Sequence, residues 1–246
     1  PATSRMLTED TYHGDPTDPL SLNLYVYCKN NPILYIDPSG HIPTAMEAAE
    51  MADHIYDATL DNKGNNIVGK WYLDDIITGG DGMKMGVYYK VKDDGTTEYA
   101  LVNKGTTATS LSDWKNNVTQ LFGNSADMKA SIEKSIKFVN DHSENEITMV
   151  GHSKGGAEAA ANAVVNNKNC IIFNPATVNL RAYDLSSSNY TASMTAFIVK
   201  GDALNYVEGW FSKSIDKAVY LPQQHGGKWY QGWQTNAKPG NIIWKR

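Results

Sequence analysis

A serine flanked by glycines has the context best suited to nucleophilic chemistry in this sequence. It is Ser153, in the pentapeptide Gly151-His152-Ser153-Lys154-Gly155. The apolar run 147–150 before it predicts a strand, and the alanine-rich run 154–165 after it predicts a helix. A strand, a sharp turn and a helix together form a nucleophile elbow, which presents a serine hydroxyl at the positive end of the helix. The alternative is a plain glycine-containing loop. We favour a nucleophile that attacks an acyl carbonyl, with the ring of His152 pointing away from it.

A nucleophilic serine needs a base that takes its proton and an acid that orients the base. In hydrolases with such an elbow, both residues follow the serine along the chain. Asp202 follows the apolar strand predicted at 196–200, so we predict that it is the acid; Asp184 and Asp216 follow no such clear strand. His225 is the one histidine after Asp202 and is the predicted base. A turn aspartate and a surface histidine are the alternatives for these two residues.

The elements that must position these residues alternate between helices and strands from residue 42 onward. Hydrophobic periodicity predicts helices at 111–121, 126–140 and 154–165, and a helix through Asp57 for which Thr44 is the predicted N-cap. Apolar runs predict strands at 85–91, 99–102, 147–150, 170–173, 196–200 and 218–221, with a hairpin turn at 93–96. Strands separated by helices imply an α/β fold, with a mostly parallel sheet flanked by helices on both faces.

A second motif lies upstream of the serine. The strand predicted at 99–102 runs into Asn103-Lys104-Gly105-Thr106-Thr107, and Asp113-Trp114 follows. With Gly-His-Ser-x-Gly-Gly at 151–156, this order resembles the class 3 lipases over residues 83–205. The resemblance implies an α/β-hydrolase-like fold and an oxyanion hole made by the backbone N–H groups of Thr106 and Lys154.

The chain departs from the class 3 lipase pattern at two places. The family usually has Phe-Arg before Gly-Thr, where this chain has Asn103-Lys104, and Leu after the nucleophile, where it has Lys154. The backbone N–H of residue 154 can serve an oxyanion whatever its side chain is. We expect the side chain of Lys154 to face solvent or a charged headgroup.

Apolar and aromatic side chains crowd the segment between the predicted acid and base. They are Leu204, Tyr206, Val207, Trp210 and Phe211. We expect Leu204, Trp210 and Phe211 to contact the substrate, either in an acyl pocket or in a lid that touches a membrane. A helix face packed against the sheet explains the same pattern equally well.

The composition limits the kinds of partner. Of 246 residues, 41% are apolar and 20% charged, and the net charge of −5 comes without a basic block, which argues against nucleic-acid binding.

Two cysteines are too few for a metal cluster or a disulfide framework, and the apolar run around Cys170 predicts a buried, inert thiol. We expect no metal and no cofactor. No apolar run approaches the roughly 18 residues of a membrane span, and the start shows no signal-peptide pattern.

Residues 1–41 have a different character from the rest, with many turn signals and a period-2 pattern at 20–27. The segments 5–10, 22–27 and 30–40 resemble the end of the core of RHS/YD-repeat proteins, in which a β cocoon encloses a C-terminal effector that is often a toxin. The resemblance implies an RHS-core tail at 1–41 and an effector domain at 42–246. Pro32 and Asp37 to Gly40 match the motif after which members of this family commonly cleave themselves, which implies a cut near His41–Ile42. His41 stands where Leu is usual, so an uncut or inert junction is the alternative. Because the chain starts at Pro1 rather than Met, we expect it to be part of a longer polypeptide.

These observations together predict a serine carboxylic-ester hydrolase of the lipase or phospholipase kind. The RHS resemblance implies a secreted or delivered bacterial effector, with a lipid substrate or membrane surface, the RHS cocoon and a cognate immunity protein as partners. Membrane phospholipid, cleaved in an A-type reaction, is then the expected substrate. The alternatives are a triacylglycerol lipase, a thioesterase, or a catalytically silent domain that binds a membrane or a partner.

Overall fold

The computed structural model of the protein describes residues 43–79, 82–106, 125–199, 215, 217–221 and 243–244. Several predicted features lie outside these residues: the tail at 1–41, the helix at 111–121, the acid Asp202, the base His225, and the pocket residues Leu204, Trp210 and Phe211. The described residues contain the serine motif, the strand that leads into it, the helix that follows it, and the first residues of the upstream loop.

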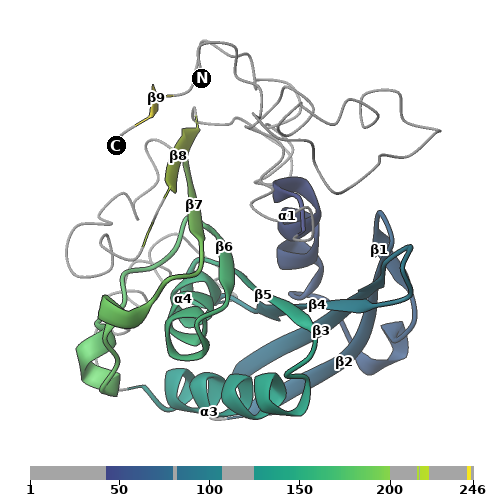
Figure 1. Ribbon diagram of the computed structural model, residues 1–246, viewed down its shortest axis with the longest axis horizontal. Coiled ribbons are helices and arrows are strands. Elements are labelled where there is room, and N and C mark those ends of the chain that lie inside the picture. Colours follow the sequence, from purple (N-terminus) through teal and green to yellow (C-terminus); the bar gives the residue numbers. More distant parts are fainter. Residues whose placement is uncertain are drawn as a thin grey trace.

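One sheet runs through the described part of the chain, with its strands in sequence order (Figure 1). Its first half is antiparallel and consists of β1 (Asn66–Val68), β2 (Trp71–Gly79), β3 (Met83–Val91) and β4 (Thr97–Asn103). From β4 onward the pairing is parallel through β5 (Glu146–His152), β6 (Asn169–Phe173), β7 (Met194–Val199) and β8 (Lys217–Leu221). The short β9 (Ile243–Trp244) pairs antiparallel with β8. Parallel strands place their carboxyl ends at one edge of the sheet, where ligands bind in open α/β folds.

Helix α1 (Ala45–His54) covers one face of the sheet. Thr44 caps it through a capping box: its hydroxyl accepts from the N–H of Glu47, and the Glu47 carboxylate accepts from the N–H of Thr44. The buried side of α1 packs with Trp71, Tyr88 and other residues of this face into one apolar cluster. The cap and this burial together explain why the segment begins its helix at residue 45.

Helices α3 (Ala126–Asp141) and α4 (Lys154–Asn166) cover the opposite face (Figure 1). Five alanines of α4 between 157 and 163 are almost wholly buried, and such small side chains let the helix axis lie close to the strands. Cys170, on β6 beneath it, is buried and free, and burial raises the pKa of its thiol, as predicted for an inert cysteine. Within the described residues, no helix has the length and apolarity that crossing a membrane requires.

The predicted α/β fold is confirmed, since the strands from β4 to β8 are parallel and helices flank the sheet. The hairpin turn at 93–96 and the helix at 126–140 are also present, the latter as α3. Strand β2 was not predicted. Asp74 and Asp75 break its apolar pattern, and its pairing with β3 is irregular between Leu73 and Asp75.

A buried carboxylate at the start of β4 makes stability depend on pH. The side chain of Glu98 is 4% exposed and lies 3.5 Å from Nζ of Lys90, and burial raises its pKa to about 7. The pKa of Glu98 is higher in the folded than in the unfolded state. The contribution of Glu98 to the free energy of unfolding is therefore fully present below about pH 4.5 and is lost as the pH rises through 7. We expect Glu98→Gln to raise the free energy of unfolding at pH 8 by about 2 kcal/mol, with little change at pH 5. Urea unfolding at both pH values measures this; equal effects at the two values would contradict it.

Candidate active site

Ser153 lies in a sharp turn between β5 and α4. Its backbone has φ 56° and ψ −123°, a conformation that side-chain-bearing residues rarely adopt. Its N–H donates to the carbonyl of Phe173 at 3.0 Å, and its carbonyl accepts from the N–H groups of Gly156 and Ala176 at 3.0 and 2.9 Å. Strain of this kind persists only where the surroundings hold it, and it gathers at functional sites. The predicted strand–turn–helix context of Ser153 is therefore present.

The glycines around the serine are required by close backbone approaches. A Cβ on Gly151 would lie 2.1 Å from the carbonyl oxygen of Gly155, and one on Gly155 would lie 2.2 Å from the carbonyl oxygen of Asn103. A Cβ on Gly156 would lie 3.0 Å from Cβ of Pro175. The first two contacts are with backbone and leave no room for a side chain, so these glycines permit the elbow and its contact with β4.

Substituting Gly155 should damage both stability and activity. Gly155→Ala pushes a methyl group into the Asn103 backbone, and we expect the free energy of unfolding to fall by about 3 kcal/mol. Gly95→Ala is the matched control: this glycine lies in the hairpin turn with φ 84° and open space around it, so only backbone strain of about 1 kcal/mol is expected. Urea unfolding of both variants, with ester turnover measured beside it, checks the prediction. Equal losses of stability would show that the Gly155 contact is unimportant.

The loop that carries Thr106 lies against the elbow. Asn103, at the end of β4, pairs with Gly151 at the end of β5. A Cβ on Gly105 would lie 2.7 Å from the carbonyl oxygen of His152, so the loop and the elbow are in direct contact. The structure thus brings the segments of Thr106, Ser153 and Lys154 together, as the oxyanion-hole prediction requires.

Tyr56, in the turn after α1, ties the same two segments together. Its phenol oxygen lies 3.0 Å from Nδ1 of His152 and accepts a hydrogen bond from the backbone N–H of Gly105. Burial lowers the pKa of His152 to about 4, so its ring is neutral at physiological pH. His152 therefore has a structural partner in Tyr56.

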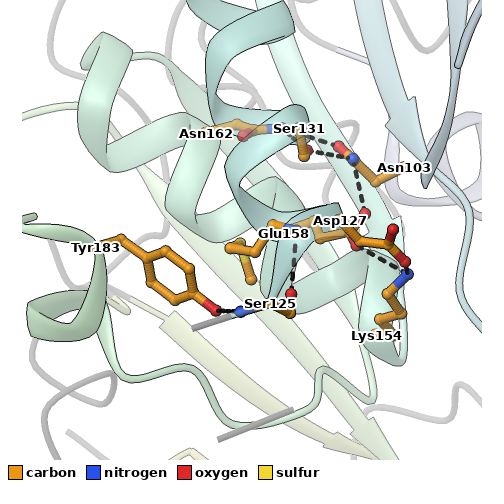
Figure 2. A network of polar contacts seen from close by, with 9 residues as sticks. Asn103, Ser125, Asp127, Ser131, Lys154, Glu158, Asn162 and Tyr183 are labelled. Atoms are coloured by element: carbon orange, nitrogen blue, oxygen red, sulfur yellow. Dashed lines mark hydrogen bonds and ion pairs between the residues drawn. The ribbon is translucent and has the colours of Figure 1, made fainter. Parts of the chain in front are cut away.

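The side chain of Lys154 does not face solvent or a headgroup, so that expectation was wrong. It is only 12% exposed, and its Nζ binds Oδ2 of Asp127 on α3 and lies 3.2 Å from Oε1 of Glu158 on α4 (Figure 2). Two carboxylates inside the protein therefore take the place of solvent as partners of the ammonium group. The backbone N–H of Lys154 stays available for an oxyanion.

Lys154 belongs to a set of buried polar side chains that we call the elbow network. Its members come from β4, α3 and α4 (Figure 2). They are Asn103, Asp127, Ser131, Lys154, Glu158 and Asn162. Burial lowers the pKa of Lys154, but Glu158 and Asp127 outweigh it and raise the pKa above its ordinary value, so the lysine is charged. Burial raises the pKa of Glu158, against the opposing effects of Lys154 and Asn103.

Sequence reasoning missed most of the elbow network and Tyr56. One signal was available: Lys154 and Glu158 are four residues apart on a predicted helix, a spacing that allows an ion pair. Nothing in the sequence shows that the pair is buried. Within the part of the chain that the structure describes, no group of three or more His, Cys, Asp or Glu side chains is arranged to hold a metal ion.

Residues 35–230 match the family described as phospholipase-like, the Tle-like phospholipase domain. The match covers most of the chain, including both the loop with Thr106 and the elbow with Ser153. The chain belongs to this family. The Tle-like domain is accordingly a lipase-like hydrolase of lipid esters. A comparison with curated protein sequences gives no significant match.

Solved lipase structures share the fold of the Tle-like domain. Lipase II from Rhizopus niveus is 16% identical with a TM-score of 0.50, over 72% of this chain and 79% of that chain. The native Rhizomucor miehei lipase propeptide complex is 10% identical with a TM-score of 0.50, over 72% of this chain and 67% of that chain. At such low identities the likeness concerns the fold, and it confirms the predicted lipase-like α/β-hydrolase architecture.

Proposed function

We propose that the Tle-like domain is a serine carboxylic-ester hydrolase that cleaves membrane phospholipid in an A-type reaction. Ser153 attacks the ester carbonyl, His225 takes its proton, and Asp202 holds His225 in the required tautomer. The ester C–O bond then breaks, and His225 gives the proton to the leaving lysophospholipid oxygen, which leaves the acyl group on Ser153. The backbone N–H groups of Thr106 and Lys154 stabilise the oxyanion. Water activated by His225 then releases the acyl group from Ser153.

The observation that carries this proposal is the strained backbone of Ser153 at the amino end of α4. A tight turn lifts a serine hydroxyl out of the backbone, and the backbone N–H of Lys154 at the start of the helix supplies a donor where negative charge develops. The neighbouring loop at 104–106 supplies the second side of such a hole. The family match supports lipid as the substrate.

The phospholipid preference rests on the family match. Nζ of Lys154 is held by Asp127 and Glu158, so we do not assign phosphate binding to it. We therefore assign substrate contact to the segment of Leu204, Trp210 and Phe211, as an acyl pocket or a lid at the membrane.

The substrate class can be tested with the purified chain. Vesicles of phosphatidylethanolamine with phosphatidylglycerol should yield free fatty acid and lysophospholipid, identified by mass spectrometry, while Ser153→Ala yields neither. Triolein emulsion and an acyl-CoA thioester are presented in parallel. Faster turnover of triolein or the thioester would replace the phospholipase assignment with a triacylglycerol lipase or a thioesterase. Vesicle binding without product would indicate a silent binding domain.

For the biological setting, we propose that residues 1–41 end an RHS core and that residues 42–246 form its effector. The effector is delivered to a competing cell, acts on its membrane, and is neutralised by a cognate immunity protein in the producer. Directing residues 42–246 to the periplasm of a Gram-negative host should stop growth, and Ser153→Ala should restore it. Normal growth with the active enzyme present would contradict the toxin role.

A further inference from the structure

The elbow network connects the two segments that carry the proposed oxyanion donors. Asn103 ends β4 three residues before Thr106, and Lys154 directly follows Ser153. Their side chains do not bond to each other. Both reach the same residue, Glu158, one turn further along α4 (Figure 2).

Glu158 divides its two carboxylate oxygens between these segments. Its Oε1 lies 3.2 Å from Nζ of Lys154, and its Oε2 accepts a hydrogen bond from Nδ2 of Asn103 at 3.1 Å. The residue is fully buried in the protein interior. Oε1 meets Lys154 as an ion pair outside hydrogen-bond geometry, and Oε2 accepts a directional hydrogen bond from Asn103, so one carboxylate links the two segments.

The partners of Glu158 are themselves immobilised by α3 and α4. Nδ2 of Asn103 also donates to Oγ of Ser131 at 2.7 Å, and Oδ1 of Asn103 accepts from Asn162 at 3.1 Å. Nζ of Lys154 is also held by Asp127. Neither Asn103 nor Lys154 can therefore move without breaking contacts to two helices.

Stability alone does not explain a buried ionic group at this point. Burying a carboxylate has an energetic cost that its partners offset at best, and apolar residues of similar size often stabilise a core equally well. Apolar packing lacks direction, whereas an oxyanion hole needs its donors within a few tenths of an ångström of their working positions. We propose that Glu158 is a positioning residue, which holds the N–H groups of Lys154 and Thr106 in register for the oxyanion. This inference rests on the proposed function.

The test compares Glu158→Ala and Glu158→Gln with a control in the same pair of helices. The control is Asn166→Ala, which removes the hydrogen bonds from Nδ2 of Asn166 to Oγ of Ser135 and to the backbone carbonyl of Asn162 at the far end of α4, and leaves the side-chain bonds of the elbow network in place. Full-length variants are assayed with p-nitrophenyl butyrate, a soluble ester that needs no membrane. The kcat, the KM and the melting temperature are measured for each variant.

We expect Glu158→Ala to lower kcat about 10- to 100-fold while KM changes less than about threefold. Glu158→Gln keeps an oxygen that can accept from Asn103, so its kcat should fall less than that of Glu158→Ala. Asn166→Ala should lower the melting temperature and leave kcat within about twofold of the wild type. Because Glu158→Gln preserves size and shape, it tests the proposal even if Glu158→Ala fails to fold.

Two results would overturn the positioning role. If the Glu158 variants melt at lower temperature but keep the wild-type kcat, Glu158 only stabilises the fold. If Asn166→Ala lowers kcat as much as Glu158→Ala does, the effect is a general one of instability. Ser153→Ala is assayed in parallel to detect failure of the proposed function. If the wild type and Ser153→Ala are equally active, the proposed hydrolase function fails, and the positioning role of Glu158 fails with it.

Discussion

Replacing Ser153 with alanine is expected to lower kcat for ester hydrolysis about 10³- to 10⁶-fold. The alanine keeps Cβ, so it adopts the same strained backbone, but it has no oxygen to form the acyl intermediate. The residual rate over water would come from substrate binding and the oxyanion hole alone. Circular dichroism should show an unchanged fold. Turnover of p-nitrophenyl butyrate and of phospholipid vesicles measures the loss.

Ser143→Ala is the matched control for this prediction. Ser143 is an exposed serine in the turn between α3 and β5, at the opposite end of β5 from the elbow, and its loss should leave kcat unchanged. An active Ser153→Ala variant would exclude Ser153 as the nucleophile, even if the domain hydrolyses lipid.

Replacing His225 with alanine should have an effect almost as large, about 10³-fold or more on kcat, because Ser153 would lose its base. Asp202→Asn should lower kcat by up to about 10⁴-fold, because the amide favours the wrong tautomer of the histidine. His142→Ala is the control for the base: this ring, at the end of α3, bonds to the carbonyl of Phe138 and stacks on its ring.

Asp184→Asn is the control for the acid. Asp184 ends a short 3₁₀-helix at 180–183 with φ 57°, a position that a turn aspartate commonly takes, so its substitution should leave kcat within about twofold. Steady-state kinetics on a soluble ester measures all four variants. A large loss in Asp184→Asn with full activity in Asp202→Asn would reassign the acid.

The sequence predicted the elements that carry strong local signals. The order of strand, Gly-x-Ser-x-Gly and helix predicted the elbow. The apolar run 147–150 predicts the strand, the alanine-rich run predicts the helix, and the glycines leave room for the tight turn between them. Thr44 predicted the start of α1 because its side chain and that of Glu47 form a local capping box. These features depend on residues within a few positions of each other.

The features that the sequence did not predict depend on contacts between distant elements. Glu158 in an alanine-rich helix has the pattern of a solvent-facing residue, and only the packing of α4 between α3 and β4 buries it. The mistaken expectation for Lys154 has the same cause, because its partner Asp127 is 27 residues away. Strand β2 was not predicted because Asp74 and Asp75 interrupt the alternation of apolar and polar residues. The segment forms a strand because it pairs with β3.

The elbow network contains a residue from each of the two departures from the class 3 lipase pattern. This chain differs at Asn103, Lys104 and Lys154, and of these Asn103 and Lys154 contact Glu158. These two residues are therefore parts of one buried polar arrangement. In this chain, an ion pair and hydrogen bonds join the end of β4 to the elbow.

The nucleophile itself can be identified by labelling with a fluorophosphonate, which reacts with an activated serine to form a stable tetrahedral adduct. The labelled protein is digested, and the modified peptide is sequenced by mass spectrometry. We predict one adduct, on Ser153, that forms in step with the loss of esterase activity and is absent from Ser153→Ala. An inactivated enzyme whose adduct lies on another residue, or an active hydrolase that retains full activity with Ser153 labelled, would contradict the assignment of Ser153 as the nucleophile.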